Sequence, residues 1–307
     1  MDGVLNINKP SGMTSHDVVA RLRRVLNEKK IGHTGTLDPD ATGVLPVCLG
    51  KATKIIQFLP DHEKGYEGTI TLGITTDTLD AGGQVLNTAD SSHVKQEDVE
   101  SVLKSFVGAI EQTPPMISAV KVQGERLYKL ARQGKTVDRK PREIHIYELE
   151  LLDFEDSMLD FRVLCSRGTY VRVLASEIGD ALGCGAHLSR LVRTKSGLFD
   201  LKDSVPLEKI QADPQIAPGL MRSIDDVLSF MPAITVSELA RKRFLNGIPV
   251  DAGDITRCDK GFGIDSLVRI RDEAEMLLGI GRATEDYDPK AELYPRAMIC
   301  KAVKVLK

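Results

Sequence analysis

Strict alternation of apolar and polar residues is the feature that most constrains this chain. Between residues 66 and 75, Tyr66, Ile70 and Leu72 alternate with threonines, and residues 159–165 repeat the pattern. A period of two places the apolar side chains on one face, as in a β-strand covered on one side. Residues 97–107 instead place their apolar side chains at helical spacing. The chain therefore combines a half-buried sheet with amphipathic helices.

Composition bounds the class of protein. The chain has 307 residues, 42% hydrophobic and 28% charged, which suits one large and one small domain, or two medium ones, and excludes a disordered chain. No apolar run is long enough for a membrane-spanning helix, and the first residues do not resemble a secretory leader. The five cysteines are widely scattered, which favours free thiols in a reducing compartment. We therefore expect a cytoplasmic protein.

The net charge of −3 gives no overall attraction to a polyanion, so any nucleic-acid site must be local. Residues 121–145 carry eight basic against three acidic side chains, a local balance of +5. Residues near Leu127 and Leu130 look helical, while the flanks are rich in Gly, Gln and Lys. This pattern predicts a protruding basic arm over about residues 117–142, although a charge run is more often only a solvated surface.

The stretch from Gly32 to Gly50 contains four glycines and two prolines, too many for a long helix, and it predicts an ordered loop. Its spacing fails as a phosphate-binding P-loop and as an aspartyl-phosphate motif. In a third interpretation, Asp38 is the reacting group, because an ionised carboxylate can attack or remove a proton without an activating base. The alternative is an ordinary Asp-Pro turn.

Six segments decide between these alternatives by their order and spacing: NKPSGMTS (8–15), GHTGTLDPDATGVLP (32–46), KGY (64–66), TDTLDAG (76–82), RGTYVR (167–172) and GCGAHLSRL (183–191). Together they resemble the TruB family of bacterial tRNA pseudouridine synthases over residues 2 to about 200. The remainder resembles a small RNA-binding PUA module more weakly. The resemblance implies an α+β fold with a mixed, mainly antiparallel catalytic sheet over residues 1–231. A PUA-like β-barrel is expected over residues 232–307.

The resemblance also implies an activity: isomerisation of uridine 55 in the T-loop of tRNA to pseudouridine, on a base flipped out of its stack. The chemistry needs no redox cofactor or ATP, so no cofactor is expected. No metal is expected either, because Cys184 and His187 lack a second pair of ligands at zinc-site spacing. The expected partner is tRNA, bound through its T-arm and acceptor stem, and the protein is expected to act as a monomer.

The same resemblance assigns roles to individual residues. Asp38 is the expected catalytic carboxylate, Tyr66 stacks on the flipped uracil, and Tyr170 and Arg172 form the pocket floor, with Arg172 paired to Asp38 to keep it ionised. The expected substrate-binding residues are Lys9, His33, Leu191, Lys129 and Arg132. Whether Asp38 attacks the base, attacks the sugar or removes a sugar proton stays open. Two rival functions are an RNA-binding protein without catalysis and a nucleotide-dependent phosphotransferase.

Overall fold

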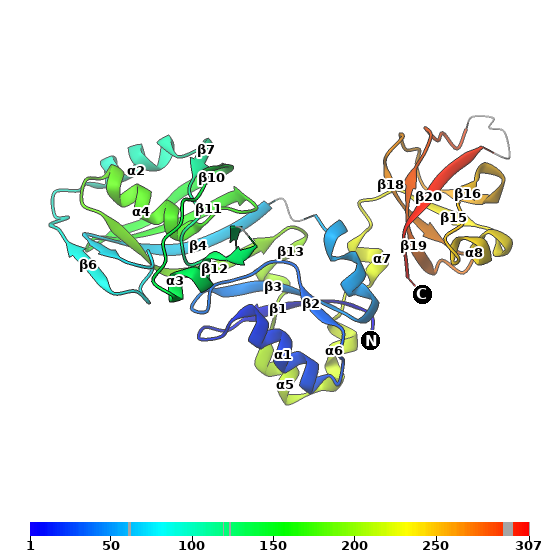
Figure 1. Ribbon diagram of the computed structural model, residues 1–307, viewed down its shortest axis with the longest axis horizontal. Coiled ribbons are helices and arrows are strands. Elements are labelled where there is room, and N and C mark those ends of the chain that lie inside the picture. Colours follow the sequence, from blue (N-terminus) through cyan, green and yellow to red (C-terminus); the bar gives the residue numbers. More distant parts are fainter. Residues whose placement is uncertain (61–62, 119, 123, 291–296, 307) are drawn as a thin grey trace.

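A large mixed sheet carries most of the first two thirds of the chain, and a smaller barrel follows it (Figure 1). The computed structural model describes residues 1–60, 63–118, 120–122, 124–290 and 297–306, without the side chains of residues 121, 126, 128 and 132. None of the helices in these ranges is long and apolar enough to cross a membrane.

Ten strands form the large sheet within the described residues. Its main path runs through β14 (Val205–Pro206), β1 (Gly3–Lys9), β3 (Thr42–Leu49), β12 (Ala186–Ser196), β4 (Glu63–Leu72), β11 (Met158–Ser166), β10 (Arg142–Glu155) and β7 (Gly108–Gln112), with β2 (Ile31–His33) beside β3 and β13 (Phe199–Asp200) beside β12. In this path only β1–β14 and β12–β3 pair in parallel. The prediction of a mixed, mainly antiparallel sheet is confirmed.

Two sets of helices cover the two halves of this sheet. Helices α2 (Gln96–Ser105) and α4 (Val171–Ala181) pack on the half formed by β4, β10, β11 and β12, around the buried Phe161 and Leu174. Helices α1 (Ser15–Val25) and α5 (Leu207–Ala212) pack on β1 and β3 (Figure 1). Thr14 caps α1, because its hydroxyl accepts from the Asp17 amide at 3.1 Å and the Asp17 carboxylate accepts from the Thr14 amide at 2.9 Å.

Short elements connect these parts. They are the 3₁₀-helices η1 (Gly50–Phe58), η2 (Leu201–Asp203), η3 (Pro214–Ile216) and η4 (Ala252–Asp254), the helices α3 (Leu127–Arg132), α6 (Ala217–Leu220) and α7 (Ile224–Val227), and the two-stranded ribbons β5 (Ile74–Thr76) with β6 (Val85–Thr88) and β8 (Lys121–Val122) with β9 (Glu125–Arg126). The β8–β9 ribbon and α3 lie in the predicted arm.

The expectation that residues 32–50 form a loop is wrong for Thr42–Leu49, which are the strand β3 in the middle of the sheet. Glycine and proline exclude a helix here but not a strand, and the apolar run of Val44, Leu45, Val47 and Leu49 is fully buried. Gly43 is needed where β3 meets β12: its φ is +100°, and an added Cβ would lie 2.2 Å from the Arg193 carbonyl oxygen. Only residues 34–41 are the loop.

Within its described residues, the C-terminal part is a nearly closed six-stranded barrel, which confirms the prediction of a small β-barrel. Its strands follow the order β16 (Val250–Asp251), β20 (Met298–Val305), β19 (Leu277–Ala283), β18 (Leu267–Arg271), β15 (Ala233–Val236) and β17 (Ile255–Cys258). Helix α8 (Glu238–Phe244) places Phe244 in the barrel core beside Ile234 and Val268. Ile280 and Leu306 of the barrel pack against Val4 and Ile55.

Candidate active site

Asp38 lies in the loop of residues 34–41 that connects β2 to β3. The start of α1 fixes this loop, because the Leu37 amide donates to the Ser15 hydroxyl at 2.8 Å and the Ser15 hydroxyl donates to the Leu37 carbonyl at 3.3 Å. The Ala41 amide closes a turn on the Asp38 carbonyl at 3.2 Å. Both flanking residues, Leu37 and Ala41, are buried, so the turn holds Asp38 in one place.

Lys9 stabilises the Asp38 loop through its buried ammonium group. Its side chain is fully buried, and Nζ donates to the carbonyl oxygens of Pro10 at 2.9 Å, Met13 at 2.5 Å and Pro39 at 2.8 Å. Burial lowers the pKa of Lys9 to about 8, although the carboxylates of Asp40 and Asp38 oppose this shift. The ammonium group ties β1 to the residue that follows Asp38.

Arg193 clamps the same loop from the other side and was missed by the sequence analysis. It lies on β12 with 1% of its surface exposed, and it donates to the carbonyl oxygens of Val44 at 2.7 Å, Gly35 at 3.2 Å and Thr36 at 3.3 Å. Strand parity from Leu191 places it on the pocket side. Parity alone would not single out an arginine, because arginines are usually exposed.

Arg172 connects three segments at the centre of the site. It lies in the first turn of α4, is 5% exposed, and places Nη2 3.1 Å from Asp38 Oδ2 and Nη1 3.5 Å from Asp80 Oδ2. Nη2 also donates to the Ile117 carbonyl at 2.8 Å. Asp80, which sequence analysis did not single out, is oriented by the Thr78 hydroxyl at 2.5 Å and by the Gly82 amide at 3.2 Å. The TDTLDAG segment was the available signal.

The charge state of Asp38 results from opposing effects. The surrounding protein partly desolvates the carboxyl and raises its pKa, and the like charges of Asp80 and Asp40 act in the same direction. The cations of Arg172 and Lys9 lower its pKa but do not overcome the desolvation. Arg172 therefore favours ionisation, as expected, but leaves the pKa of Asp38 above its ordinary value. The carboxylate stays open to a ligand, because 48% of the side chain is exposed.

A recess of about 300 Å³ opens in front of Asp38. Its walls include four other residues that the sequence analysis assigned to the site: Tyr66, Tyr170, Leu191 and Arg172. Tyr66 projects from β4 into this recess and is 8% exposed, and burial raises the pKa of its hydroxyl to about 12. The volume is at the lower end of the range for small-ligand sites, about 300–1,000 Å³. Polar and aromatic groups thus converge on a space suited to one flat ring.

The backbone of Tyr170, which precedes α4, is held by a side chain from strand β7. Gln112 at the end of β7 is 2% exposed, its Oε1 accepts from the Tyr170 amide at 2.7 Å, and its Nε2 donates to the Tyr170 carbonyl at 3.2 Å. These two bonds hold the residue that precedes α4. The start of α4, with Arg172 in its first turn, is therefore fixed to the sheet.

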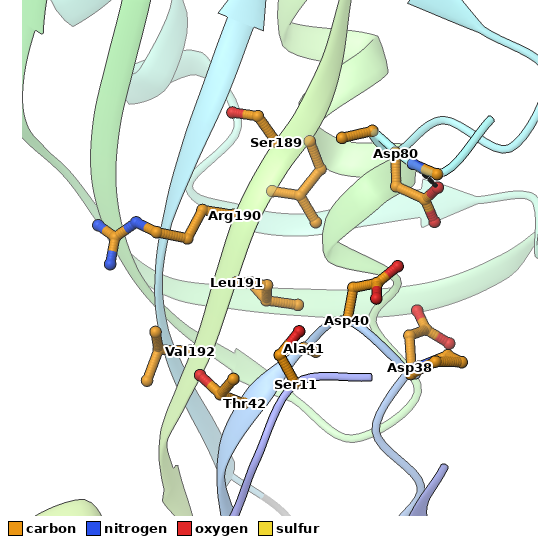
Figure 2. A pocket seen from close by; sticks show the side chains of 14 residues that line it. Ser11, Asp38, Asp40, Ala41, Thr42, Asp80, Ser189, Arg190, Leu191 and Val192 are labelled. Atoms are coloured by element: carbon orange, nitrogen blue, oxygen red, sulfur yellow. Dashed lines mark hydrogen bonds between the residues drawn. The ribbon is translucent and has the colours of Figure 1, made fainter. Parts of the chain in front are cut away.

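A second recess, of about 610 Å³, adjoins the first and shares Asp38 and Leu191 with it. Figure 2 shows Asp38, Asp40 and Asp80 along one side of it, while Arg190 extends from the other side. The two residues common to both recesses mark the boundary between them. Asp38 can therefore be approached from two directions.

Three predicted site residues with described side chains do not line either recess: Lys9, which braces the Asp38 loop, His33 and Lys129. His33 lies on β2; burial lowers its pKa, a bond with the Gly35 backbone opposes this, and its Nδ1 has no hydrogen-bond partner within the described residues. Lys129 is exposed on α3. Arg132 ends α3, and its side chain lies outside the described part of the structure. Across the described ranges, no cluster of three or more His, Cys, Asp or Glu is placed to hold a metal ion.

Comparison with known proteins identifies the class of enzyme to which this fold and pocket belong as the pseudouridine synthases. Residues 23–171 match the family model "TruB family pseudouridylate synthase (N terminal domain)", and residues 172–228 match "tRNA pseudouridylate synthase B C-terminal domain". The chain belongs to the TruB family and is therefore an isomerase. The predicted family and enzyme class are confirmed.

Relatives and solved structures agree with this assignment. The chain is 50% identical over 257 residues to tRNA pseudouridine synthase B of Bacillus cytotoxicus, covering 81% of this chain and 84% of the relative. It is 49% identical over 253 residues to the protein of the same name from Syntrophotalea carbinolica, covering 82% and 83%. A Cbf5-Nop10-Gar1 complex matches with a TM-score of 0.74 and 29% identity, over 99% of this chain and 85% of that chain. An H/ACA RNP bound to substrate RNA matches with a TM-score of 0.75 and 27% identity, with the same coverage.

Proposed function

We propose that this enzyme converts uridine 55 in the T-loop of tRNA to pseudouridine. The observation that carries the proposal is the convergence of Asp38, Tyr66 and Arg172 on one recess of about 300 Å³. The names of the relatives support tRNA as the substrate. The position within tRNA rests on the resemblance of the six sequence segments.

Asp38 supplies the carboxylate that initiates the reaction. The N-glycosidic bond of the uridine breaks, the uracil turns, its C5 forms the new bond to C1′, and the proton on C5 moves to the released ring nitrogen. No electron or phosphate is gained or lost, so the isomerisation needs no cofactor. Attack on the base, attack on the sugar and removal of a sugar proton all require an ionised Asp38. Arg172, 3.1 Å from that carboxylate, stabilises the ionised form.

Side chains of the recess replace the stacking interactions that the flipped uracil loses in the RNA. Tyr66 presents a buried aromatic ring, and stacking of a base on such a ring contributes roughly 1–3 kcal/mol. Leu191 supplies an apolar wall, and Tyr170, whose backbone is held by Gln112, completes the floor. The flipped base thus exchanges its neighbours in the T-loop for protein side chains.

The remaining predicted residues bind or position the RNA around the pocket. Lys9 braces the Asp38 loop, His33 stacks within the opened T-loop, and the arm over about residues 117–142 closes on the RNA through Lys129 and Arg132. We assign residues 1–231 to the catalytic domain and residues 232–307 to a PUA-like domain that holds the acceptor stem. The enzyme acts as a monomer in the cytoplasm, where its tRNA substrate lies.

Mapping of modified uridines tests this function. The purified protein, incubated with unmodified tRNA and no cofactor, is expected to produce pseudouridine at position 55 and at no other uridine, and a tRNA carrying cytidine 55 is expected to stay unmodified. Pseudouridine at another position would contradict the substrate site. Binding of tRNA with no pseudouridine at any position would favour an RNA-binding protein without catalysis.

A further inference from the structure

Ser118 carries a buried hydroxyl that the mechanism above does not use. It is 6% exposed, and its Oγ has no hydrogen-bond partner among the residues that the structure describes. An unpaired hydroxyl in a protein interior destabilises the fold, so buried polar atoms are nearly always satisfied. Ser118 also lines the recess that contains Asp38 and Tyr66. A ligand in that recess can supply the missing partner.

The backbone around Ser118 is anchored to the catalytic residues. The carbonyl of the preceding residue, Ile117, accepts from Arg172 Nη2 at 2.8 Å, and the Ser118 amide donates to the Met116 carbonyl at 3.1 Å. Arg172 in turn is bonded to Asp38. Ser118 therefore belongs to the beginning of the arm but is held against the pocket, whereas Lys129 further along the arm is exposed.

A second unpaired atom points to the same kind of ligand. Arg172 Nε is buried and, within the described part of the chain, has no hydrogen-bond partner. The guanidinium nitrogen can only donate, while a hydroxyl can donate or accept. Uracil offers two carbonyl acceptors, O2 and O4, and one donor, N3–H. Two unsatisfied polar atoms, each on a residue that lines a recess with an aromatic wall, therefore match the edge of a pyrimidine.

We propose that Ser118 Oγ hydrogen-bonds an edge atom of the flipped uracil and so selects and orients the base for Asp38. This inference rests on the proposed function and adds a substrate contact to it. The arm then has two distinct tasks. Its beginning recognises the base inside the pocket, and its exposed middle, with Lys129, faces the RNA backbone.

A substrate series tests the contact. Single-turnover conversion is measured for the wild type and Ser118→Ala on tRNA carrying uridine at position 55. It is also measured on tRNA carrying 2-thiouridine, 4-thiouridine or 3-deazauridine there, which weaken hydrogen bonding at O2, O4 and N3, respectively. Loss of a buried hydrogen bond predicts that Ser118→Ala converts uridine roughly tenfold more slowly. On the one analogue altered at the contacted atom, the ratio of the wild-type rate to the Ser118→Ala rate is expected to fall below about threefold. The analogue has already weakened the hydrogen bond to Ser118 Oγ, so removing the hydroxyl costs little more.

Controls separate this inference from the function on which it rests. Ser101→Ala, an exposed serine of α2, is expected to match the wild type on every substrate, and thermal unfolding checks that Ser118→Ala is folded. A loss of equal size on all four substrates, or no loss on uridine, would overturn the role of Ser118 while leaving the function intact. Failure of the wild type to modify uridine 55 would instead reject the proposed function.

Discussion

Desolvation and the carboxylates of Asp80 and Asp40 raise the pKa of Asp38, while the cations of Arg172 and Lys9 lower it. The net effect is a pKa above the ordinary value for aspartate, with loss of water as the largest cause. Because the proposed chemistry needs the ionised carboxylate, this shift determines where activity is lost on acidification. A raised pKa means that protonation, and therefore inactivation, begins at a higher pH than for an aspartate in water.

The single-turnover rate is accordingly expected to rise with pH through the raised pKa of Asp38. Asp80→Asn removes a like charge that raises this pKa, so the acidic limb of the pH profile is expected to move to lower pH. Asp90→Asn, an exposed residue that lines neither recess, serves as the control and is expected to leave the limb unchanged. A limb that stays in place or moves to higher pH in Asp80→Asn would contradict the electrostatic account.

Lys9→Met tests the support beneath Asp38. Methionine fills a similar volume but leaves the three carbonyl oxygens of Pro10, Met13 and Pro39 without their donor. The free energy of unfolding is expected to fall by about 3 kcal/mol, measured by chemical denaturation. The exposed Lys104→Met on α2 is expected to change it by less than about 0.5 kcal/mol. Equal stability of Lys9→Met and the wild type would show that the buried ammonium is not a brace.

At the scale of elements, local patterns located some of the site and missed the rest. Alternation correctly placed Tyr66 on the buried face of its strand, and the RGTYVR segment correctly led into a helix with Arg172 at its start. Asp80 and Arg193 were missed because their importance arises from contacts with Arg172 and with the Asp38 loop, which are distant in sequence. The central strand β3 was missed because its glycines and prolines resemble a loop pattern.

The basic arm is the element whose role is most easily tested by charge. Replacing Lys129, Arg132 and Lys135 together by glutamine is expected to weaken tRNA binding and to flatten its salt dependence. Each lost phosphate contact lowers the slope of log affinity against log salt by about 0.7–0.9. The matched control replaces the exposed Lys95, Lys104 and Lys209. An unchanged slope in the arm variant would place the RNA elsewhere.

At the scale of the whole molecule, the barrel is joined to the sheet by charge as well as by apolar packing. Asp225 in α7 accepts from Arg269 Nη1 at 3.1 Å and from Arg271 Nη2 at 2.6 Å, both in β18 of the barrel. Arg269 is 5% exposed and also bonds the Met231 carbonyl at 3.1 Å. These contacts hold the barrel in one orientation, as the proposed binding of the T-arm and acceptor stem of one tRNA requires.

Asp225→Ala is expected to loosen this orientation without altering the pocket. If the barrel and the sheet bind one tRNA together, the affinity for full-length tRNA falls roughly tenfold because the second contact is no longer prepositioned. A T-arm hairpin, which reaches only the pocket, is expected to bind and react within about twofold of the wild type. Binding isotherms for both RNAs check this expectation. Equal losses on both RNAs would mean that the substitution damages the catalytic sheet.

The most direct test of the account is the conversion of tRNA by Asp38→Asn, which keeps the size of the side chain and removes its charge. The account predicts that the variant binds tRNA as the wild type does and forms no pseudouridine at position 55 in a single turnover. Conversion at a rate near that of the wild type would show that another group initiates the reaction.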